Sequence, residues 1–371
     1  MTDERSAAPD DGAWMRRALA LAERGWGHTA PNPMVGAVVV QDGVVVGEGW
    51  HAHYGGPHAE VEALRAAGER ARGATLYVSL EPCNHFGKTP PCTDAILAAG
   101  VRRVVAACVD PSPVAGGGAE RLREAGVEVT VGVEDASARE INAPFFHAFS
   151  SERPFVRLKL ALSLDGAVAD RSRQPAWLTG ELARREVHRM RAGVDAIAVG
   201  IGTVLTDDPE LTVRHAPPPR VAPMRVVFDT SARLPRTSKL AKTAAQVPVI
   251  VVCWAPEPAH AAALEHTGVM LLHAATSRDA LVGLRERGVR SLLVEGGAAL
   301  ASALIQEALV DRLIIFRAPL VLGKGALNAF GAIPPVPVAD APRWRLLRTQ
   351  RFEDDEMSIY APPAAGGGRA I

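Results

Sequence analysis

Four side chains in the first quarter of the chain could together hold a metal ion and move a proton. His58 and Glu60 are separated by one residue, and Cys83 and Cys92 follow them. One imidazole and two thiolates are a good ligand set for zinc, and a catalytic zinc keeps a fourth position for water. Zinc lowers the pKa of that water to about 7, and a carboxylate nearby can shuttle protons. These residues predict a hydrolytic zinc site with Glu60 as its catalytic group.

The order of these residues is typical of zinc-dependent nucleobase deaminases, whose pattern is H-x-E followed by P-C-x-x-C. Pro82 precedes Cys83 as the pattern requires, but residues 84–91 lengthen the spacing between the two cysteines. Each signal alone is weak, because a free cysteine is among the most buried residue types. Together they favour the metal site. Cys108 and Cys253 stand inside apolar segments and are predicted to be core residues.

The residues of this site lie at the ends of predicted helices and strands. His58 opens a helix, Cys83 follows a strand, and Cys92 precedes a helix whose unpaired N–H groups favour a thiolate. After a hairpin, strands alternate with helices, which is typical of a sheet with both faces covered. The apolar pattern predicts helices over 13–24, 59–72, 93–99 and 119–125, and strands over 35–40, 44–50, 75–80, 101–109 and 127–131.

The second half repeats this alternation, so the predicted fold class is α/β. We predict two domains, residues 1–149 and 150–371, with a low-complexity tail at 362–371 that we expect to be disordered. Predicted strands cover 155–164, 194–200, 225–229, 247–254, 269–273, 291–295 and 311–322; predicted helices cover 180–192, 257–266, 277–287 and 297–308; residues 343–351 and 357–360 form a closing antiparallel pair.

The composition excludes several classes of protein. A chain of 371 residues with 48% hydrophobic and 22% charged content is a globular protein of about two domains. Its 41 basic and 41 acidic residues cancel, but residues 1–150 carry 13 Lys/Arg against 19 Asp/Glu. An acidic first half argues against binding of nucleic acid. With no signal peptide and no apolar run long enough for a membrane helix, we expect a cytoplasmic protein without a membrane partner.

The second half contains segments that could bind phosphate. Gly296 and Gly297 stand between a predicted strand and a helix, where glycines let a phosphate approach the helix N-terminus. Residues 200–209 are a second loop-forming cluster at a strand end. Arg191 and Arg214 suit bidentate capture of a phosphate. Lys159 and Asp165, although polar, are assigned to structure or to the polarity of the site.

Ten segments resemble one known family, the bifunctional deaminase/reductase of riboflavin biosynthesis. The resemblance runs from about residue 13 to residue 360 and implies a cytidine-deaminase-like three-layer domain followed by a dihydrofolate-reductase-like α/β domain that uses NADPH. The segments are PNPMVG (31–36), GWH (49–51), PHAE (57–60), SLEPCNHFGKTPPC (79–92), LKLALSLDG (158–166), WLT (177–179), RA (191–192), GTV (202–204), DDP (207–209) and LTVR (211–214).

The resemblance also implies a role for individual residues. In the first domain, His58, Cys83 and Cys92 would bind zinc and Glu60 would shuttle protons. The residues around the pyrimidine and its phosphoribosyl arm would be Asn32, His51, His85 and Lys88. The NADPH contacts would be Ala161, Trp177, Thr203, Asp207, Thr230, Gly297, Ala298, Ala299 and Leu300, with Arg233 near the 2′-phosphate. The substrate contacts of the reductase domain would be Arg191, Leu211, Arg214 and Glu295.

Two reactions follow from the resemblance. The first domain would remove the exocyclic amine of 2,5-diamino-6-(5-phosphoribosylamino)pyrimidin-4-one, and the second would reduce the ribosyl group to give 5-amino-6-(5-phosphoribitylamino)uracil.

Pro175 departs from the family, which has Ser at this position. Proline has neither a hydroxyl nor an N–H donor, so the polar contact of that serine is lost.

Two alternatives remain open at this stage. One is a tRNA deaminase whose second half binds RNA, and the other is a non-catalytic nucleotide-binding protein. The predicted partner is a small phosphoribosyl pyrimidine, and we expect a homo-oligomer, either a dimer or a tetramer.

Overall fold

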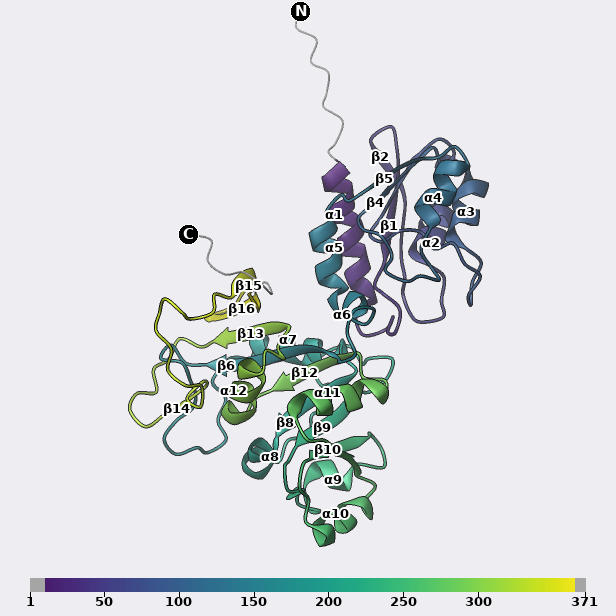
Figure 1. Cartoon of the computed structure of the whole chain (residues 1–371). Coiled ribbons are helices and arrows are strands. Elements are labelled where there is room, and N and C mark those ends of the chain that lie inside the picture. Colours follow the sequence, from purple (N-terminus) through teal and green to yellow (C-terminus); the bar gives the residue numbers. More distant parts are fainter. Residues whose placement is uncertain (1–10, 364–371) are drawn as a thin grey trace, which may run out of the picture. The chain divides into compact units, whose positions relative to one another are not determined.

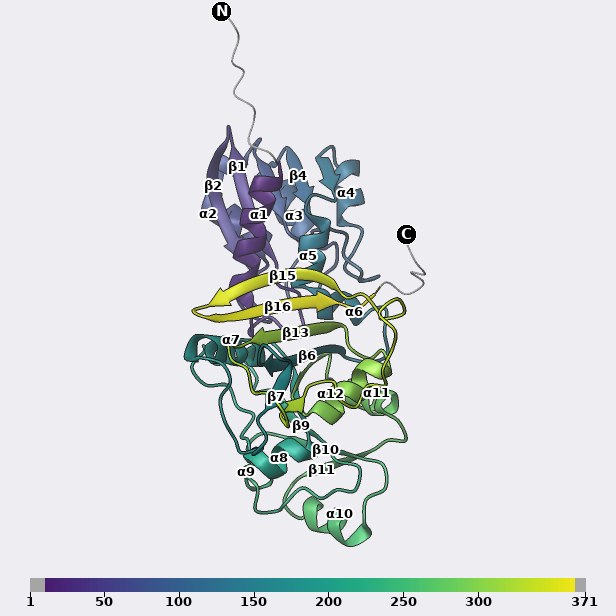
Figure 2. The same cartoon turned by 90° about the vertical axis from the view of Figure 1, so that its left-hand side faces the viewer.

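The computed structural model describes residues 11–363 and divides after Ser150 into two compact units. Unit 1 ends at Ser150 and unit 2 begins at Ser151. Figures 1 and 2 show each unit as a sheet with helices packed against it. Of the tail that we expected to be disordered, residues 364–371 lie outside the described residues.

The sheet of unit 1 has five strands in the order β2-β1-β3-β4-β5. The valines on either side of Asp42-Gly43 form the antiparallel β1–β2 hairpin. Strand β3 pairs antiparallel with β1, and β3, β4 and β5 are parallel to one another. The strands are β1 (Gly36–Gln41), β2 (Val44–Trp50), β3 (Thr75–Val78), β4 (Arg103–Ala106) and β5 (Glu128–Val131).

Helices cover both faces of this sheet, which gives three layers. Met15, Leu19 and Ala138 pack on one face from α1 (Asp11–Ala22) and α5 (Asp135–Ile141). The other face is covered by α2 (Ala59–Ala67), α3 (Cys92–Ala99) and α4 (Gly118–Glu124). Short turns η1 (Glu23–Gly25) and η2 (Gly68–Ala71) extend α1 and α2, and α6 (Ala143–His147) precedes the boundary.

Unit 2 contains a nine-stranded sheet in the order β11-β10-β9-β8-β12-β6-β13-β16-β15. The first seven strands in this order are parallel, and β16 and β15 continue antiparallel from β13. The strands are β6 (Phe155–Leu162), β8 (Ala196–Gly200), β9 (Met224–Phe228), β10 (Val249–Cys253), β11 (Met270–His273), β12 (Ser291–Glu295), β13 (Arg312–Arg317), β15 (Arg345–Phe352) and β16 (Asp355–Ala361).

Helices also cover both faces of this second sheet. One core contains α7 (Glu181–Ala192), α8 (Ile201–Asp207), α9 (Lys239–Lys242) and α10 (Pro258–Glu265). The opposite core contains α11 (Ser277–Glu286) and α12 (Ala298–Gln306). The α/β class predicted from the sequence is confirmed in both units. A small antiparallel pair is formed by β7 (Ala167–Ala169) and β14 (Leu327–Asn328).

Helix α8 was not predicted, since the sequence indicated only a loop there. Ile201 and Val204 are buried and form the apolar side of this short helix. Asp208, with a φ of 41°, ends the helix in the left-handed region.

Among residues 11–363, no helix is both long and apolar enough to cross a membrane.

Candidate active sites

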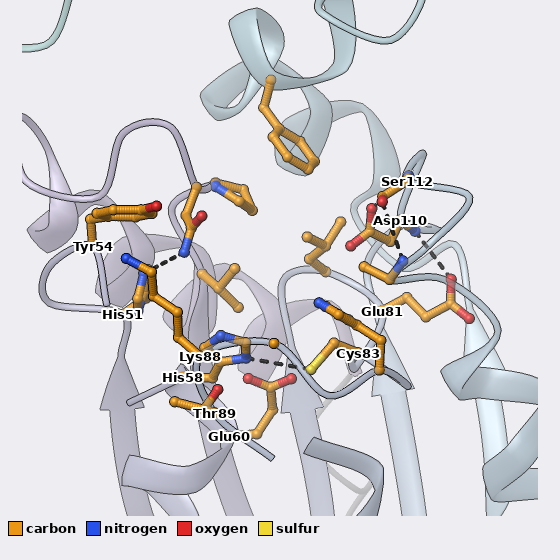
Figure 3. Close-up of a pocket in the computed structure, with 18 of the residues that line it drawn as sticks. His51, Tyr54, His58, Glu60, Glu81, Cys83, Lys88, Thr89, Asp110 and Ser112 are labelled. Carbon is orange, nitrogen blue, oxygen red and sulfur yellow. Dashed lines mark hydrogen bonds between the residues drawn. The ribbon is translucent and has the colours of Figure 1, made fainter. Parts of the chain in front are cut away.

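Three side chains of unit 1 bring their ligand atoms to one point. His58 is the extended N-cap residue of α2, Cys83 follows β3, and Cys92 is the first residue of α3. The Nδ1 atom of His58 lies 3.2 Å from the Sγ atom of Cys92 and 3.5 Å from that of Cys83. All three ligand atoms lie within 4.8 Å of one another. Figure 3 shows His58 and Cys83 facing each other in this pocket.

These distances fit a tetrahedral zinc ion. Bonds of about 2.0 Å to nitrogen and about 2.3 Å to sulfur put neighbouring ligand atoms roughly 3.6 Å apart. Hydrogen bonds from Cys92 and His58 lower the pKa of Cys83, which favours its thiolate. A thiolate is the form of cysteine that binds metal. The donor set and its charge therefore suit zinc.

Glu60 lies beside the triad and is almost fully buried. Its carboxylate points toward His58 and Cys83 in Figure 3. Burial raises the pKa of Glu60 to about 6, although the charge of His58 opposes this rise. A carboxyl group with a pKa near neutrality can both accept and release a proton.

Asn32 and His51 form a chain of hydrogen bonds that fixes the orientation of both side chains. The Nδ1–H of His51 donates to the carbonyl oxygen of Pro57 at 2.9 Å, because a carbonyl can only accept. The Nε2 atom of His51 is then an acceptor, and it receives a hydrogen bond from Nδ2 of Asn32 at 3.2 Å. The Oδ1 atom of Asn32 therefore remains available to accept a hydrogen bond from an N–H group of a ligand.

The pocket beside the triad has a volume of about 300 Å³ and is lined by every substrate residue predicted for unit 1. These residues are Asn32, His51, His85 and Lys88. The ammonium group of Lys88 lies 4.0 Å from the ring centre of Tyr54, and Figure 3 shows both side chains in the pocket. The buried Nδ1 atom of His85 has no hydrogen-bond partner among residues 11–363, and the residue lines the pocket.

Glu81 supports the loop that carries Cys83. Its carboxylate accepts hydrogen bonds from the backbone N–H of Asp110 at 3.1 Å and of Ala119 at 2.9 Å. Gly118 makes a close approach to the same loop, because a Cβ atom added there would lie 1.8 Å from the carbonyl oxygen of Pro82. The 110–119 segment thus backs the metal-binding loop, and Asp110 and Ser112 line the pocket.

A second polar cluster lies at the carboxyl end of β12 in unit 2. Arg191 of α7 binds both carboxylate oxygens of Glu295, at 2.5 and 2.9 Å. The ammonium group of Lys159 lies 3.9 Å from the same carboxylate. Burial raises the pKa of Glu295, but the charges of Arg191 and Lys159 more than offset this and lower the value to about 2. Glu295 is therefore ionised and held by two cations.

Two helix N-termini meet near this cluster. Helix α8 begins after Gly200 and α12 after Gly297. A Cβ atom added to Gly297 would lie 3.6 Å from Oγ1 of Thr203 and 3.9 Å from the backbone nitrogen of Gly200. Around Gly202 a Cβ atom would meet nothing within 4 Å. Glycine backbone and helix N-termini form a cradle suited to the phosphates of a dinucleotide.

The two units match two different family models. Residues 9–108 match the zinc-binding region of the cytidine and deoxycytidylate deaminases. Residues 154–357 match the RibD C-terminal domain, which is more than half of the chain. The chain belongs to the RibD family.

Relatives confirm this membership over nearly the whole length. The riboflavin biosynthesis protein RibD of Aquifex aeolicus is 44% identical over 85% of this chain and 88% of its own. RibD of Escherichia coli is 41% identical over 93% of this chain and 97% of its own. Among solved structures, Acinetobacter baumannii RibD has a TM-score of 0.82 at 40% identity, with 95% of this chain and 98% of that chain covered.

A solved structure from Thermotoga maritima has the same fold. That protein is described as a diaminohydroxyphosphoribosylaminopyrimidine deaminase/5-amino-6-(5-phosphoribosylamino)uracil reductase. It has a TM-score of 0.82 at 36% identity, with 95% of this chain and 98% of that chain covered. Because unit 2 is the RibD reductase domain, the alternative of an RNA-binding second half is wrong.

The RibD membership makes NADPH the cofactor of unit 2, and the parallel strands bring several predicted contacts to one edge of the sheet. Ala161 is near the end of β6, and Thr230 follows β9. Thr203 lies in the first turn of α8, and residues 297–300 begin α12. The carboxyl ends of parallel strands lie at one edge, which is where such sheets bind nucleotides.

The remaining predicted cofactor contacts lie in more exposed positions. Asp207 is the last residue of α8. Trp177 is 76% exposed, with the guanidinium of Arg184 lying 5.1 Å from its ring centre. Arg233 forms a 3.4 Å ion pair with Asp229.

The structure places two side chains in the first site that the sequence did not assign to it, and it gives Lys159, which the sequence assigned to structure or to polarity, a specific partner. Tyr54 lines the pocket of unit 1, Glu81 holds its loop, and Lys159 lies beside Glu295. The sequence pattern already indicated that Lys159 has a buried partner, because a lysine in the middle of an apolar strand needs one. Glu81 belongs to the segment 79–92 that carries the family resemblance, whereas nothing in the local sequence pointed to Tyr54.

Proposed function

We propose that this chain catalyses two successive steps of riboflavin biosynthesis. Unit 1 deaminates 2,5-diamino-6-(5-phosphoribosylamino)pyrimidin-4-one, and unit 2 reduces the ribosyl group of the product with NADPH, giving 5-amino-6-(5-phosphoribitylamino)uracil. The observation that carries the proposal is the His58–Cys83–Cys92 triad with Glu60 buried beside it. RibD relatives of nearly full length support the pairing of the two activities.

In unit 1, His58, Cys83 and Cys92 would hold zinc. Zinc, when bound, supplies Lewis-acid activation of water at neutral pH. The Oδ1 atom of Asn32 accepts a hydrogen bond from the pyrimidine edge, and Lys88 meets the phosphate of the ribosyl arm. His51 and His85 complete the pocket. The carboxyl group of Glu60 takes a proton from water and gives it to the departing amine, so that water and substrate yield ammonia and the uracil.

In unit 2, the residues around Glu295 would bind the ribosyl phosphate. NADPH, when bound, supplies the hydride. Arg214 carries an exposed guanidinium, whose ion-pair partner among residues 11–363 is exposed Glu210 at 2.6 Å, and is the cation best able to turn to a phosphate. Arg191 is engaged with Glu295 and with the carbonyl oxygen of Thr212. We therefore propose that Arg191 orients Glu295 toward the substrate, whereas Arg214 and Leu211 contact the substrate directly.

The cofactor would lie along the carboxyl edge of the sheet. The N-terminus of α12, at Gly297, Ala298, Ala299 and Leu300, would bind its phosphates together with Thr203. Further proposed contacts of NADPH are Ala161, Trp177, Asp207 and Thr230. The backbone cradle between α8 and α12 supports this arrangement.

We also propose that the enzyme works in the cytoplasm as a dimer or tetramer. All four cysteines are free and buried, which suits a reducing compartment. Strand β15 is the edge of a nine-stranded sheet and exposes Leu346, an arrangement that pairing with a second copy would protect. Light scattering of the purified protein measures the number of copies.

The central experiment incubates the purified protein with the diaminopyrimidine phosphate, with and without NADPH. We expect ammonia release in both samples and loss of nicotinamide absorbance only when NADPH is present. Metal analysis of the same sample should find about one zinc per chain. Failure to release ammonia from zinc-loaded protein would reject the deaminase assignment.

A further inference from the structure

One side of helix α7 makes two hydrogen bonds to the loop that carries Arg214, the proposed phosphate contact of unit 2. His188 and Arg191 are three residues apart, so they project from the same side of the helix. Arg191 donates from Nη1 to the carbonyl oxygen of Thr212 at 2.8 Å. The backbone N–H of Arg214 donates to Nδ1 of His188 at 3.0 Å. The main chain on either side of Val213 is thus held at two points by one helix.

The loop adopts a backbone conformation that requires such support. Asp208, Leu211 and His215 all have positive φ angles, of 41°, 52° and 55°. Side chains other than glycine rarely adopt this region, and they persist there where the surroundings hold them. The loop between α8 and β9 therefore depends on its contacts with α7 to keep this shape.

The chemistry of the His188 contact requires a neutral imidazole ring. A backbone N–H can only donate, so Nδ1 of His188 carries a lone pair and its proton is on Nε2. Burial, followed by the charges of Arg191 and Arg214, lowers the pKa of His188 to about 4; His215 acts in the same direction, and Glu295 opposes it. The ring of His188 also packs edge-on against His215, with 5.7 Å between ring centres.

We propose that His188 is a positioning residue of the reductase site, which fixes the main chain at Arg214 so that the Arg214 side chain is aimed at the substrate phosphate. This proposal rests on the proposed reductase function. His188 is 8% exposed, and it acts through the loop and not by touching the substrate. Loss of its acceptor should weaken binding of the phosphorylated substrate and leave the cofactor and the hydride step unchanged.

The test compares two variants of the full-length protein. His188→Asn keeps an acceptor oxygen close to the position of Nδ1, whereas His188→Leu fills the space without an acceptor. With 5-amino-6-(5-phosphoribosylamino)uracil and NADPH, we expect His188→Leu to raise the KM for the uracil at least tenfold, with kcat and the KM for NADPH within twofold of the parent. His188→Asn should recover most of the affinity. Ammonia release by unit 1, measured in both variants, controls for intact protein.

Two outcomes would overturn the proposal. Equal substrate KM values in the parent and in His188→Leu would show that the contact does not matter. A parallel loss of kcat and of NADPH affinity in both variants would show that His188 only supports the fold.

A second measurement separates this proposal from the proposed function. Hydrogen exchange at the Arg214 amide should be faster in His188→Leu than in the parent and in His188→Asn. If the parent does not oxidise NADPH with this uracil, the reductase assignment fails while the exchange data still test the contact. If the Arg214 amide exchanges at the same rate in all three proteins, the positioning role fails whatever the activity.

Discussion

The guanidinium of Arg191 binds the carboxylate of Glu295 through two parallel hydrogen bonds, Nε to Oε1 at 2.5 Å and Nη2 to Oε2 at 2.9 Å. The pair joins the end of α7 to the end of β12, and both side chains are largely buried. A buried bidentate pair of this kind fixes geometry, because neither charge can turn away without losing its partner.

The ionisation of Glu295 makes unit 2 sensitive to acid. Burial opposes ionisation, but Arg191 and Lys159 lower the pKa of Glu295 from 4.5 to about 2. Because the folded-state pKa is the lower one, this stabilisation is complete above about pH 4.5 and is lost as the pH falls toward 2. Glu295→Gln should reduce the acid-dependent loss of stability, measured by hydrogen exchange of β12 peptides between pH 6 and 3. If the stability of Glu295→Gln depended on pH as that of the parent does, the acid sensitivity could not be assigned to Glu295.

Removal of Arg191 alone should lower the free energy of unfolding of unit 2 more than removal of both Arg191 and the charge of Glu295. Arg191→Met leaves a buried carboxylate without its main partner and should lower the free energy of unfolding of unit 2 by about 3–5 kcal/mol. The double variant Arg191→Met/Glu295→Gln should lose less, since no unpaired carboxylate remains and Lys159, whose pKa is lowered by burial, can release its proton. Urea-dependent hydrogen exchange of peptides from α7 and β12 measures both values. A double variant less stable than the single one would refute this account.

Substitution of Glu60 should separate the two activities. Glu60→Gln keeps the shape of the side chain but cannot accept a proton, so ammonia release should fall by about 10²–10⁴-fold. Zinc content should not change, because His58, Cys83 and Cys92 are intact. NADPH oxidation with the deaminated substrate should also persist, since it depends on unit 2. Ammonia release at the parental rate would show that Glu60 is not the proton carrier.

The close contact between Gly118 and Pro82 should affect zinc binding, because it fixes the position of the loop that carries Cys83. In Gly118→Ala the new Cβ atom would lie 1.8 Å from the carbonyl oxygen of Pro82, so the Cys83 loop must move. We expect zinc affinity, measured by competition with a chromophoric chelator, to fall at least tenfold. Gly117→Ala is the matched control: its Cβ atom meets nothing within 4 Å, and only its φ of 86° costs roughly 1–2 kcal/mol. Equal zinc affinities in the two variants would exclude the steric explanation.

The hydrogen-bond chain from Pro57 through His51 predicts the effect of changing Asn32. Asn32→Asp would place a carboxylate oxygen opposite the lone pair on Nε2 of His51, where the amide now donates. Loss of such a hydrogen bond costs about 1–3 kcal/mol, so the KM for the deaminase substrate should rise about 5- to 100-fold. The double variant Asn32→Asp/His51→Gln restores a donor and should recover part of the loss. No recovery would mean that His51 does not orient Asn32.

The sequence alone predicted the three candidate zinc ligands and determined the α/β class. His58, Cys83 and Cys92 each stand at the end of a predicted element, and the local pattern of apolar residues places those ends. The strand β2 and the starts of α2 and β6 lie where the apolar pattern predicted them. The short helix α8 was missed because its glycines and aspartates are typical of a loop, and only burial of Ile201 and Val204 against the sheet makes it helical.

The tertiary structure alone decided which polar groups meet. Arg191 and Glu295 are 104 residues apart, and no local pattern pairs them. No local pattern pairs Glu81 with the backbone N–H of Ala119 either. The tertiary structure also decides which nitrogen of His51 is the acceptor, because the other nitrogen donates to the carbonyl oxygen of Pro57. The physical reason is that a hydrogen bond needs its two atoms within about 3 Å. The packing of helices on the sheet brings distant segments that close, whereas local propensity acts only between neighbours along the chain.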